Sequence, residues 1–298
     1  MSTPVITTEN LTVFYGRHRG IIGVDLEVRE GEVFGFLGPN GAGKTTTQRV
    51  LLDLIRPLRG VAQIFGRDCQ QHGVQVRERI GYLPGELNLF ESMTANDYFD
   101  LISSVRNTNV DRSYRQELCE QLELNPNRRI REYSRGNRQK VGVVAAFMNK
   151  PDLLILDEPT TGLDPLIQRR VLNIVRAARE EGRTAFFSSH VLSEVQAVCD
   201  RVGIIREGRL IATERVDFLT ERNFRRVRLW FDHALSGTAL EMEGVKLLDE
   251  QDGALTYEVQ DNMDQLLSKA VEHQVKDIET LPVTLEEVFL AYYGEDRA

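Results

Sequence analysis

The chain has 298 residues and a formal net charge of −8, and at roughly 100 to 200 residues per domain it has room for one large and one small domain. The charge is unevenly placed, because residues 221–298 contain 17 acidic and 8 basic side chains, a net charge of −9, whereas the preceding residues sum to +1. This balance argues against a basic binding face, so we expect no nucleic acid partner and no direct docking of the C-terminal part on anionic lipid.

The first five residues lack the basic and apolar pattern of a secretory signal, and the longest apolar runs are far shorter than the about 20 residues of a membrane-spanning helix. Cys69, Cys119 and Cys199 form no C-x-x-C pair, which is typical of a reducing compartment. The sequence therefore predicts a cytoplasmic protein that reaches a membrane only through a partner.

Two strands rich in β-branched residues are predicted at 5–14 and 21–28. Tyr15 follows the first of them directly. By burial statistics a lone aromatic residue at this place belongs to the core. A nearby nucleotide site would change this expectation, because an aromatic face can support an adenine ring.

A glycine-rich loop follows a short apolar strand at 33–37 and precedes a helical pattern. The stretch 38–45 fits G-x-x-x-x-G-K-[ST] at every specified position, which predicts a phosphate-binding loop at a helix N-terminus. Lys44 would reach the outer phosphates and Thr45 would hold magnesium. The loop residues expected to contact nucleotide are Gly38, Pro39, Asn40, Gly41, Ala42, Gly43, Lys44, Thr45 and Thr46. An ordinary glycine-rich turn is the alternative, and the matching strand and helix disfavour it.

After strands at 61–65 and 79–83, the pattern is helical over 94–148, with pieces at 94–105 and 111–122. Ser134 is placed to cap a third helix. This insert interrupts an otherwise alternating order of strands and helices.

An apolar strand at 153–156 ends in two adjacent carboxylates, Asp157 and Glu158. At the C-terminal end of a strand in an open α/β sheet, Asp157 could anchor magnesium and Glu158 could polarise a water molecule. Two carboxylates that merely cap the next turn are the alternative.

Asp164 and Pro165 are predicted to start a helix that ends before Gly182. A strand at 184–189 follows, with His190 at its tip, which would face the same edge of the sheet as Asp157. A structural role is the alternative for His190. The sequence N-K-P-D at 149–152 matches a guanine-reading motif of GTPases, but it runs directly into the metal-binding strand and is discarded.

Together these motifs resemble those of ABC transporter ATP-binding subunits, over about residues 5–213. The stretch 38–45 resembles the Walker A motif, 153–158 the Walker B motif with its catalytic glutamate, 161–164 the D-loop, His190 the switch histidine and Tyr15 the adenine-stacking aromatic residue. The stretch 133–140, Y-S-R-G-N-R-Q-K, is similar to the signature that the family writes as L-S-G-G-Q-x-Q-R.

The resemblance implies a P-loop NTPase core of the α/β class with a helical subdomain, acting on ATP with Mg²⁺. It implies catalytic roles for Glu158, His190 and Lys44, and metal binding by Thr45 and Asp157. It further implies nucleotide contacts from Tyr15, Ser134, Arg135, Gly136 and Asp164. In the family, the residues that match Ser134 and Gly136 reach the γ-phosphate bound to the opposing subunit.

Two departures from the family pattern matter. Arg135 stands where the signature has its first glycine, and an arginine near an anion is chemically able to contact phosphate. Gly85 stands where the Q-loop usually has glutamine, which puts the metal and water contact of that loop in doubt; Glu86 follows it. Both variants look like those of the ABC-2 type exporter group.

The C-terminal part shows the order β-α-β-β-α-β and ends in a capping box at 284–287 before an apolar helical face. It is similar to the C-terminal extension of drug and antibiotic exporter ATPases. The sequence therefore predicts an ABC ATPase domain at 1–219, with its helical subdomain at about 94–148, and a small α+β domain at 220–298.

The resemblance implies a motor subunit of a transporter, in the exporter group, that dimerises around two ATP molecules. It would drive a separate membrane-spanning permease and lie on the inner face of the cell membrane through that permease. A homodimer is favoured and a heterodimer is left open. The alternative is a soluble ABC ATPase that acts on the ribosome or DNA, but such proteins typically carry two cassettes or a long coiled coil, and this sequence shows neither. A simple P-loop kinase would leave Ser134, Asp164 and His190 unexplained.

The stretch 85–99 joins the sheet domain to the helical insert and contains Leu87, Leu89, Phe90 and Met93 with little charge between them. It is more apolar than a solvent-facing connection requires, which predicts a docking surface for the permease.

Overall fold

The computed structural model describes residues 4–106, 111–217, 225–233, 235–251, 253–259 and 262–281. The chain forms two compact units, Met1–Val216 and Asp217–Ala298, and each is described by itself.

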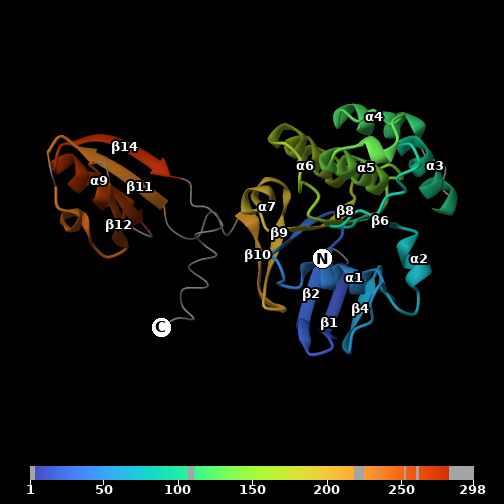
Figure 1. Ribbon diagram of the computed structural model, residues 1–298. Coiled ribbons are helices and arrows are strands. Elements are labelled where there is room, and N and C mark those ends of the chain that lie inside the picture. The colour runs from blue at the N-terminus through green and yellow to red at the C-terminus, as the bar shows by residue number, and fades with distance from the viewer. Residues whose placement is uncertain are drawn as a thin grey trace. The chain divides into compact units, whose positions relative to one another are not determined.

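A six-stranded sheet lies at the centre of the first unit (Figure 1). Its spatial order is β10 (Arg209–Arg215), β9 (Arg201–Arg206), β3 (Val33–Leu37), β8 (Thr184–Ser189), β7 (Leu153–Asp157) and β6 (Ile80–Leu83). Strands β9, β3, β8, β7 and β6 are parallel, and β10 is antiparallel to β9. The strands β3, β7 and β8 are buried along their whole length, which explains their continuous apolar sequences.

A second, antiparallel sheet has the order β2, β1, β4, β5. Its strands are β1 (Pro4–Tyr15), β2 (His18–Arg29), β4 (Arg59–Ile64) and β5 (Arg67–Asp68). Both sheets contribute to one apolar core, in which the rings of Phe34 and Phe186 stack with their centroids 6.0 Å apart and Phe36 lies beside them. This core fixes the strand that leads into the glycine-rich loop.

The helices of the first unit are α1 (Lys44–Leu51), α2 (Gly73–Arg77), α3 (Ala95–Arg106), α4 (Arg112–Gln121), α5 (Arg135–Phe147), α6 (Pro165–Glu180) and α7 (Leu192–Val198), with a 3₁₀ helix η1 (Ile130–Glu132). In Figure 1, α3, α4 and α5 gather on one side of the six-stranded sheet, away from β1, β2 and β4. The predicted caps are confirmed: Ser134 accepts a hydrogen bond from Asn137 N, and Asp164 accepts from the amides that follow Pro165.

Six elements of the first unit escaped the sequence prediction, namely α2, α7, β5, β9, β10 and η1. The helices α2 and α7 have 5 and 7 residues, too few to show a helical period. None of the described helices is long and apolar enough to cross a membrane.

The second unit is a four-stranded antiparallel sheet with the order β12, β13, β11, β14. Its elements are β11 (Arg225–Phe231), the 3₁₀ helix η2 (Gly237–Leu240), β12 (Val245–Gln251), β13 (Ala254–Val259), α9 (Met263–Glu272) and β14 (Val275–Leu281). The predicted element order is confirmed, except that the first short helix is a 3₁₀ helix. Tyr257 is fully buried and its hydroxyl donates to the carbonyl of Gly237, which ties η2 to the sheet. The predicted capping box at 284–287 lies outside the described residues.

Candidate functional site

Four neighbouring strand tips carry the predicted site residues. The strands β3, β8, β7 and β6 are parallel neighbours, so their C-terminal ends meet at one edge of the sheet. The phosphate loop follows β3, His190 follows β8, Asp157 ends β7 and the Q-loop follows β6. In the register, Leu37 lies opposite Ser189, and Asp157 lies opposite Ser188.

The phosphate loop needs glycine at three positions. Gly41 and Gly43 have φ angles of +79° and +113°, which other residues rarely adopt, and a Cβ at Gly38 would lie 2.3 Å from the carbonyl oxygen of Ile205. Lys44 folds its side chain along this loop, where Nζ donates to the carbonyl oxygens of Gly38 at 2.7 Å and Pro39 at 3.3 Å. The loop ends at the N-terminus of α1, which has no side-chain cap. Uncapped N–H groups at a helix N-terminus are suited to bind an anion.

Asp157 and Thr45 lie side by side at the centre of the site. Asp157 is 2% exposed, and it accepts hydrogen bonds from Thr45 Oγ1 at 2.7 Å and from Ser188 Oγ at 2.6 Å. Hydroxyl and carboxylate oxygens are the ligands that magnesium prefers. The two residues predicted to hold Mg²⁺ therefore have the right donor atoms in the right place, and they fit the ion.

Glu158 lies between Lys44 and His190. Its Oε1 is 3.5 Å from Lys44 Nζ and 3.1 Å from His190 Nδ1, and its Oε2 accepts from Thr161 Oγ1 at 3.2 Å. Burial, the largest single influence, acts to raise the pKa of Glu158. The hydrogen bond and charge of His190, the charge of Lys44 and the hydrogen bond from Thr161 outweigh it, so the pKa lies below its ordinary value. Glu158 is thus held as a carboxylate beside the anion-binding loop.

Tyr15 lies beside the C-terminal end of the phosphate loop. Its side chain is 44% exposed, and its hydroxyl lies 3.4 Å from Thr46 Oγ1. It lines a cavity of about 280 Å³ together with Asn40, Lys44 and Glu158. The interpretation of Tyr15 as a core residue is therefore wrong. Its ring is available beside the phosphate loop, where a nucleotide base could contact it.

The signature residues do not reach the phosphate loop of their own chain. Ser134, Arg135 and Gly136 start α5 and do not line the cavity around Lys44. They pack against the D-loop instead: a Cβ at Gly136 would lie 2.9 Å from the carbonyl oxygen of Gly162, and the side chain of Arg135 runs alongside Gly162. Asp164 likewise lies outside this cavity, because its carboxylate caps α6.

Gly85 is packed against Asp157, the carboxylate predicted to hold the metal. A Cβ built at Gly85 would lie 3.0 Å from Asp157 Oδ2, so a side chain at this position would press on Asp157. Glycine is therefore suited to this backbone arrangement, in which glutamine would require the loop to shift. Gly85 and Glu86 line a cavity of about 400 Å³ together with Thr45 and Asp157.

The structure adds three polar residues that the sequence reasoning did not assign to the site. The hydroxyl of Ser188 donates to Asp157. The amide of Glu158 donates to the carbonyl oxygen and the Oγ of Ser188. Gln139 Nε2 donates to the carbonyl oxygens of Glu158 and Pro159. Glu194 accepts from Thr160 and Ser189. Gln139 could have been found, because it matches the second glutamine of the signature, whereas Glu194 lies in a helix too short to recognise.

This arrangement agrees with what known proteins show. The ABC transporter family matches residues 21–161. The bacitracin transport ATP-binding protein BcrA of Bacillus licheniformis is 34% identical over 265 residues, which cover 87% of this chain and 83% of that protein. The daunorubicin resistance ATP-binding protein DrrA3 of Streptomyces coeruleorubidus is 33% identical over 100% of this chain and 98% of that protein.

A solved structure of an ATP-binding subunit of an ABC transporter is 28% identical and superposes with a TM-score of 0.67, over 72% of this chain and 91% of that one. The predicted α/β fold with a P-loop NTPase core is confirmed by this superposition. ATP-binding subunits of this family hydrolyse ATP, dimerise and work with separate membrane permease chains. With the phosphate loop, the carboxylates and the histidine at one sheet edge, and with identity above 30% along the whole chain, this protein belongs to the ABC transporter family as an ATP-hydrolysing, ATP-binding subunit.

Proposed function

We propose that the chain is the motor subunit of an exporter, in which Glu158 is the residue that activates water for ATP hydrolysis. The position of Glu158 supports this role most strongly, because its carboxylate is held between Lys44 and His190 at the end of the phosphate loop. Export is supported by relatives that are named for bacitracin transport and daunorubicin resistance.

In this proposal each site residue has one task. The N–H groups of the loop and Lys44 hold the triphosphate, and Tyr15 stacks on the adenine. Thr45 and Asp157 hold Mg²⁺, which when bound neutralises charge on the phosphates. Glu158 accepts a proton from the attacking water, and His190 fixes the orientation of Glu158 by the 3.1 Å contact.

Ser134, Arg135, Gly136 and Asp164 act on the ATP of a second subunit in this proposal. The N-terminus of α5 presents unpaired N–H groups, yet it lies outside the cavity around Lys44. If two chains pack head to tail about a two-fold axis, the start of α5 in one chain can face the ATP phosphates held by the other chain. A homodimer meets this requirement, and a heterodimer with a related chain would meet it as well.

The stretch 85–99 is the proposed docking surface for the permease. It lies at the junction between the sheet edge that carries Asp157 and the helices α3 to α5, so that movement there can reach the site. Docking would place the chain in the cytoplasm, on the inner face of the membrane.

The test is the Glu158→Gln variant, which keeps the shape of the side chain and removes the base. We expect hydrolysis to fall ~100-fold or more while ATP binding persists and dimers accumulate. The measurements are steady-state phosphate release, nucleotide binding by calorimetry and the oligomeric state with ATP. An Asp152→Asn variant is the matched control, since that exposed carboxylate pairs with Arg79 away from the site. Near-normal turnover by Glu158→Gln would overturn the assignment.

A further inference from the structure

Glu194 is a buried acidic residue on α7 whose two oxygens bridge two segments. It is 7% exposed. Its Oε1 accepts a hydrogen bond from Thr160 Oγ1 at 2.5 Å, and its Oε2 accepts from Ser189 Oγ at 2.7 Å. Ser189 is the last residue of β8, and Thr160 lies in the loop after β7. One side chain therefore joins the two places where the loops leave these strands.

These two loops carry the pair proposed to activate water. Thr160 lies two residues after Glu158, and Ser189 directly precedes His190. The contact between Glu158 and His190 crosses from one loop to the other at 3.1 Å. Glu194 therefore forms a second link between the same two segments, the loop after β7 and the end of β8.

The sheet itself does not hold the two loops together at this level. Asp157 and Ser188 are the last residues paired between β7 and β8, and the amide of Glu158 still reaches Ser188. Beyond that pair the register joins Ser189 to Leu37 of β3 and not to β7, and Glu194 links Ser189 to Thr160.

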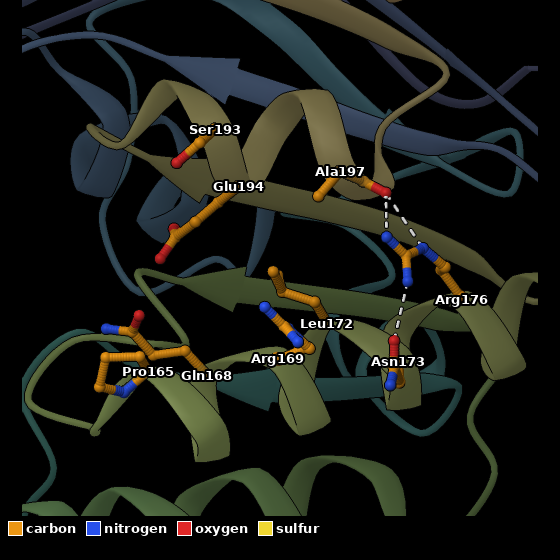
Figure 2. Close-up of a pocket in the computed structure, with 9 residues that line it drawn as sticks. All are labelled: Pro165, Gln168, Arg169, Leu172, Asn173, Arg176, Ser193, Glu194 and Ala197. Atoms are coloured by element: carbon orange, nitrogen blue, oxygen red, sulfur yellow. Dashed lines mark hydrogen bonds between the residues drawn. The ribbon is translucent and has the colours of Figure 1, made fainter.

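Glu194 also lines a cavity between α6 and α7 (Figure 2). In this view the Glu194 carboxylate points away from α7, toward the side of the cavity where Pro165 and Gln168 lie. Gln168 Nε2 donates to the carbonyl oxygens of Thr160 and Leu163. Thr160 is thus held by Gln168 of α6 and by Glu194 of α7. Of these two side chains, Glu194 also holds Ser189.

Burying the carboxyl group of Glu194 costs free energy, which argues that its hydrogen bonds have a specific role. A buried carboxyl group requires hydrogen bonds at both oxygens, whereas an apolar side chain of the same size would pack without that requirement. Directional bonds fix where Thr160 and Ser189 lie, which apolar packing does less sharply.

We propose that Glu194 is a positioning residue for ATP hydrolysis, which sets the distance between Glu158 and His190 by holding Thr160 and Ser189. The proposal rests on the roles assigned above to Glu158 and His190. Because Glu194 lies outside the cavity lined by Tyr15 and Lys44, it should control the rate of hydrolysis and leave nucleotide affinity unchanged.

The test uses Glu194→Met in the full chain, a change that keeps the side-chain length and removes both hydrogen bonds. We expect kcat per nucleotide-binding site to fall ~10 to 100-fold, because small misplacements of a catalytic pair cost rates of this order, while KM and the ATP dissociation constant stay within about twofold. Glu194→Gln keeps one accepting oxygen and should give an intermediate kcat. Glu180→Met on the exposed side of α6 is the matched control and should turn over normally.

A second set of variants changes the two hydrogen-bond donors and leaves Glu194 in place. Thr160→Val with Ser189→Ala removes both donors, and this double variant should reproduce the loss in kcat. Adding Glu194→Met to it should cause little further loss, because the same bridge is already broken. Thermal unfolding of each variant and ATP-binding stoichiometry separate a misplaced pair from a smaller folded fraction.

Two results would overturn the inference: a kcat of Glu194→Met within about twofold of the parent, or a loss that appears as raised KM at unchanged kcat. Glu158→Gln and His190→Ala are measured in parallel. If they lose turnover while Glu194→Met does not, the inference fails and the proposed function stands. If they keep normal turnover, the roles of Glu158 and His190 fail.

Discussion

Glu158 has a backbone conformation that residues other than glycine rarely adopt, with φ at +50°. Such a conformation costs about 1 to 3 kcal/mol and persists only where the surroundings enforce it. Here its amide bonds to Ser188 enforce it, together with the contacts of its carboxylate to Lys44 and His190. The strain directs the carboxylate toward the phosphate loop.

The lowered pKa of Glu158 leads to a pH prediction. A carboxyl group whose pKa is lower in the folded protein stays ionised as the pH falls past its ordinary value of 4.5, and its contribution to stability disappears only as the pH falls through the lowered pKa. His190→Ala removes the hydrogen bond and the charge interaction through which His190 lowers this pKa, so the pKa should rise. A carbon-detected NMR titration of the Glu158 carboxyl in both proteins measures the change. An unchanged pKa would show that His190 does not act on Glu158.

Tyr15 yields a prediction about nucleotide affinity. Tyr15→Ala should weaken ATP binding by ~1 to 3 kcal/mol, the range typical of a base stacked on an aromatic ring. GTP binding should weaken to a similar extent, because any purine offers a face to the ring. Phe14→Ala is the matched control, since Phe14 is 43% exposed next to Tyr15 and does not line the cavity. Equal ATP dissociation constants for Tyr15→Ala and the parent, measured by calorimetry, would leave the ring without a binding role.

At the scale of elements, the connection from β6 to α3 is less exposed than its sequence indicates. Leu87, Leu89 and Met93 are only partly exposed, whereas Phe90 is 56% exposed and its ring lies 6.4 Å from that of Tyr98. Most of the apolar residues in the stretch 85–99 therefore help to attach the helical insert. Phe90 is the part of the proposed docking surface that is open to a partner.

This narrows the docking prediction to one position. In the assembled complex, a crosslinker attached at Phe90→Cys should reach the permease, whereas one attached at Val105→Cys, which is 77% exposed near the end of α3, should reach it much less. The native cysteines are buried and should add little background. Mass spectrometry identifies the products. Crosslinks from position 90 that land only within the same chain would contradict the proposal.

At the scale of the whole molecule, the proposal gives the chain two anion sites that line different places. One is the phosphate loop with Lys44, and the other is the start of α5 with Ser134 and Gly136. If two chains share each ATP, the γ-phosphate becomes a ligand common to both. ATP should then promote dimers, and hydrolysis should release them.

Mixed dimers test this sharing. When Ser134→Arg is combined with Lys44→Ala, one site of the mixed dimer loses both elements and the other site keeps both. We expect partial ATPase activity in the mixture and almost none with either variant alone, measured at equal total protein. Absence of activity despite demonstrated mixed dimers would mean that the sites are not shared or that both must act together.

The sequence alone determined the phosphate loop, the strand that ends in Asp157 and Glu158, the cap residues Ser134 and Asp164, and the class of fold. These features depend on local patterns: glycine spacing, continuous apolar strands and capping side chains. The strand bounds 33–37 and 184–189 were predicted to the residue.

Only the tertiary structure decided how these parts act on one another. The close approach of Gly85 to Asp157 and the bridge formed by Glu194 depend on segments that are distant in sequence and meet because β8, β7 and β6 are neighbours in the sheet. The exposure of Tyr15 likewise appears only in the folded chain. Strand order leaves no periodic trace in a single sequence, since it is fixed by which faces are buried together. The short helix α7 belongs to the site because its Glu194 carboxylate lies between Thr160 and Ser189, a contact that the sequence of the helix does not indicate.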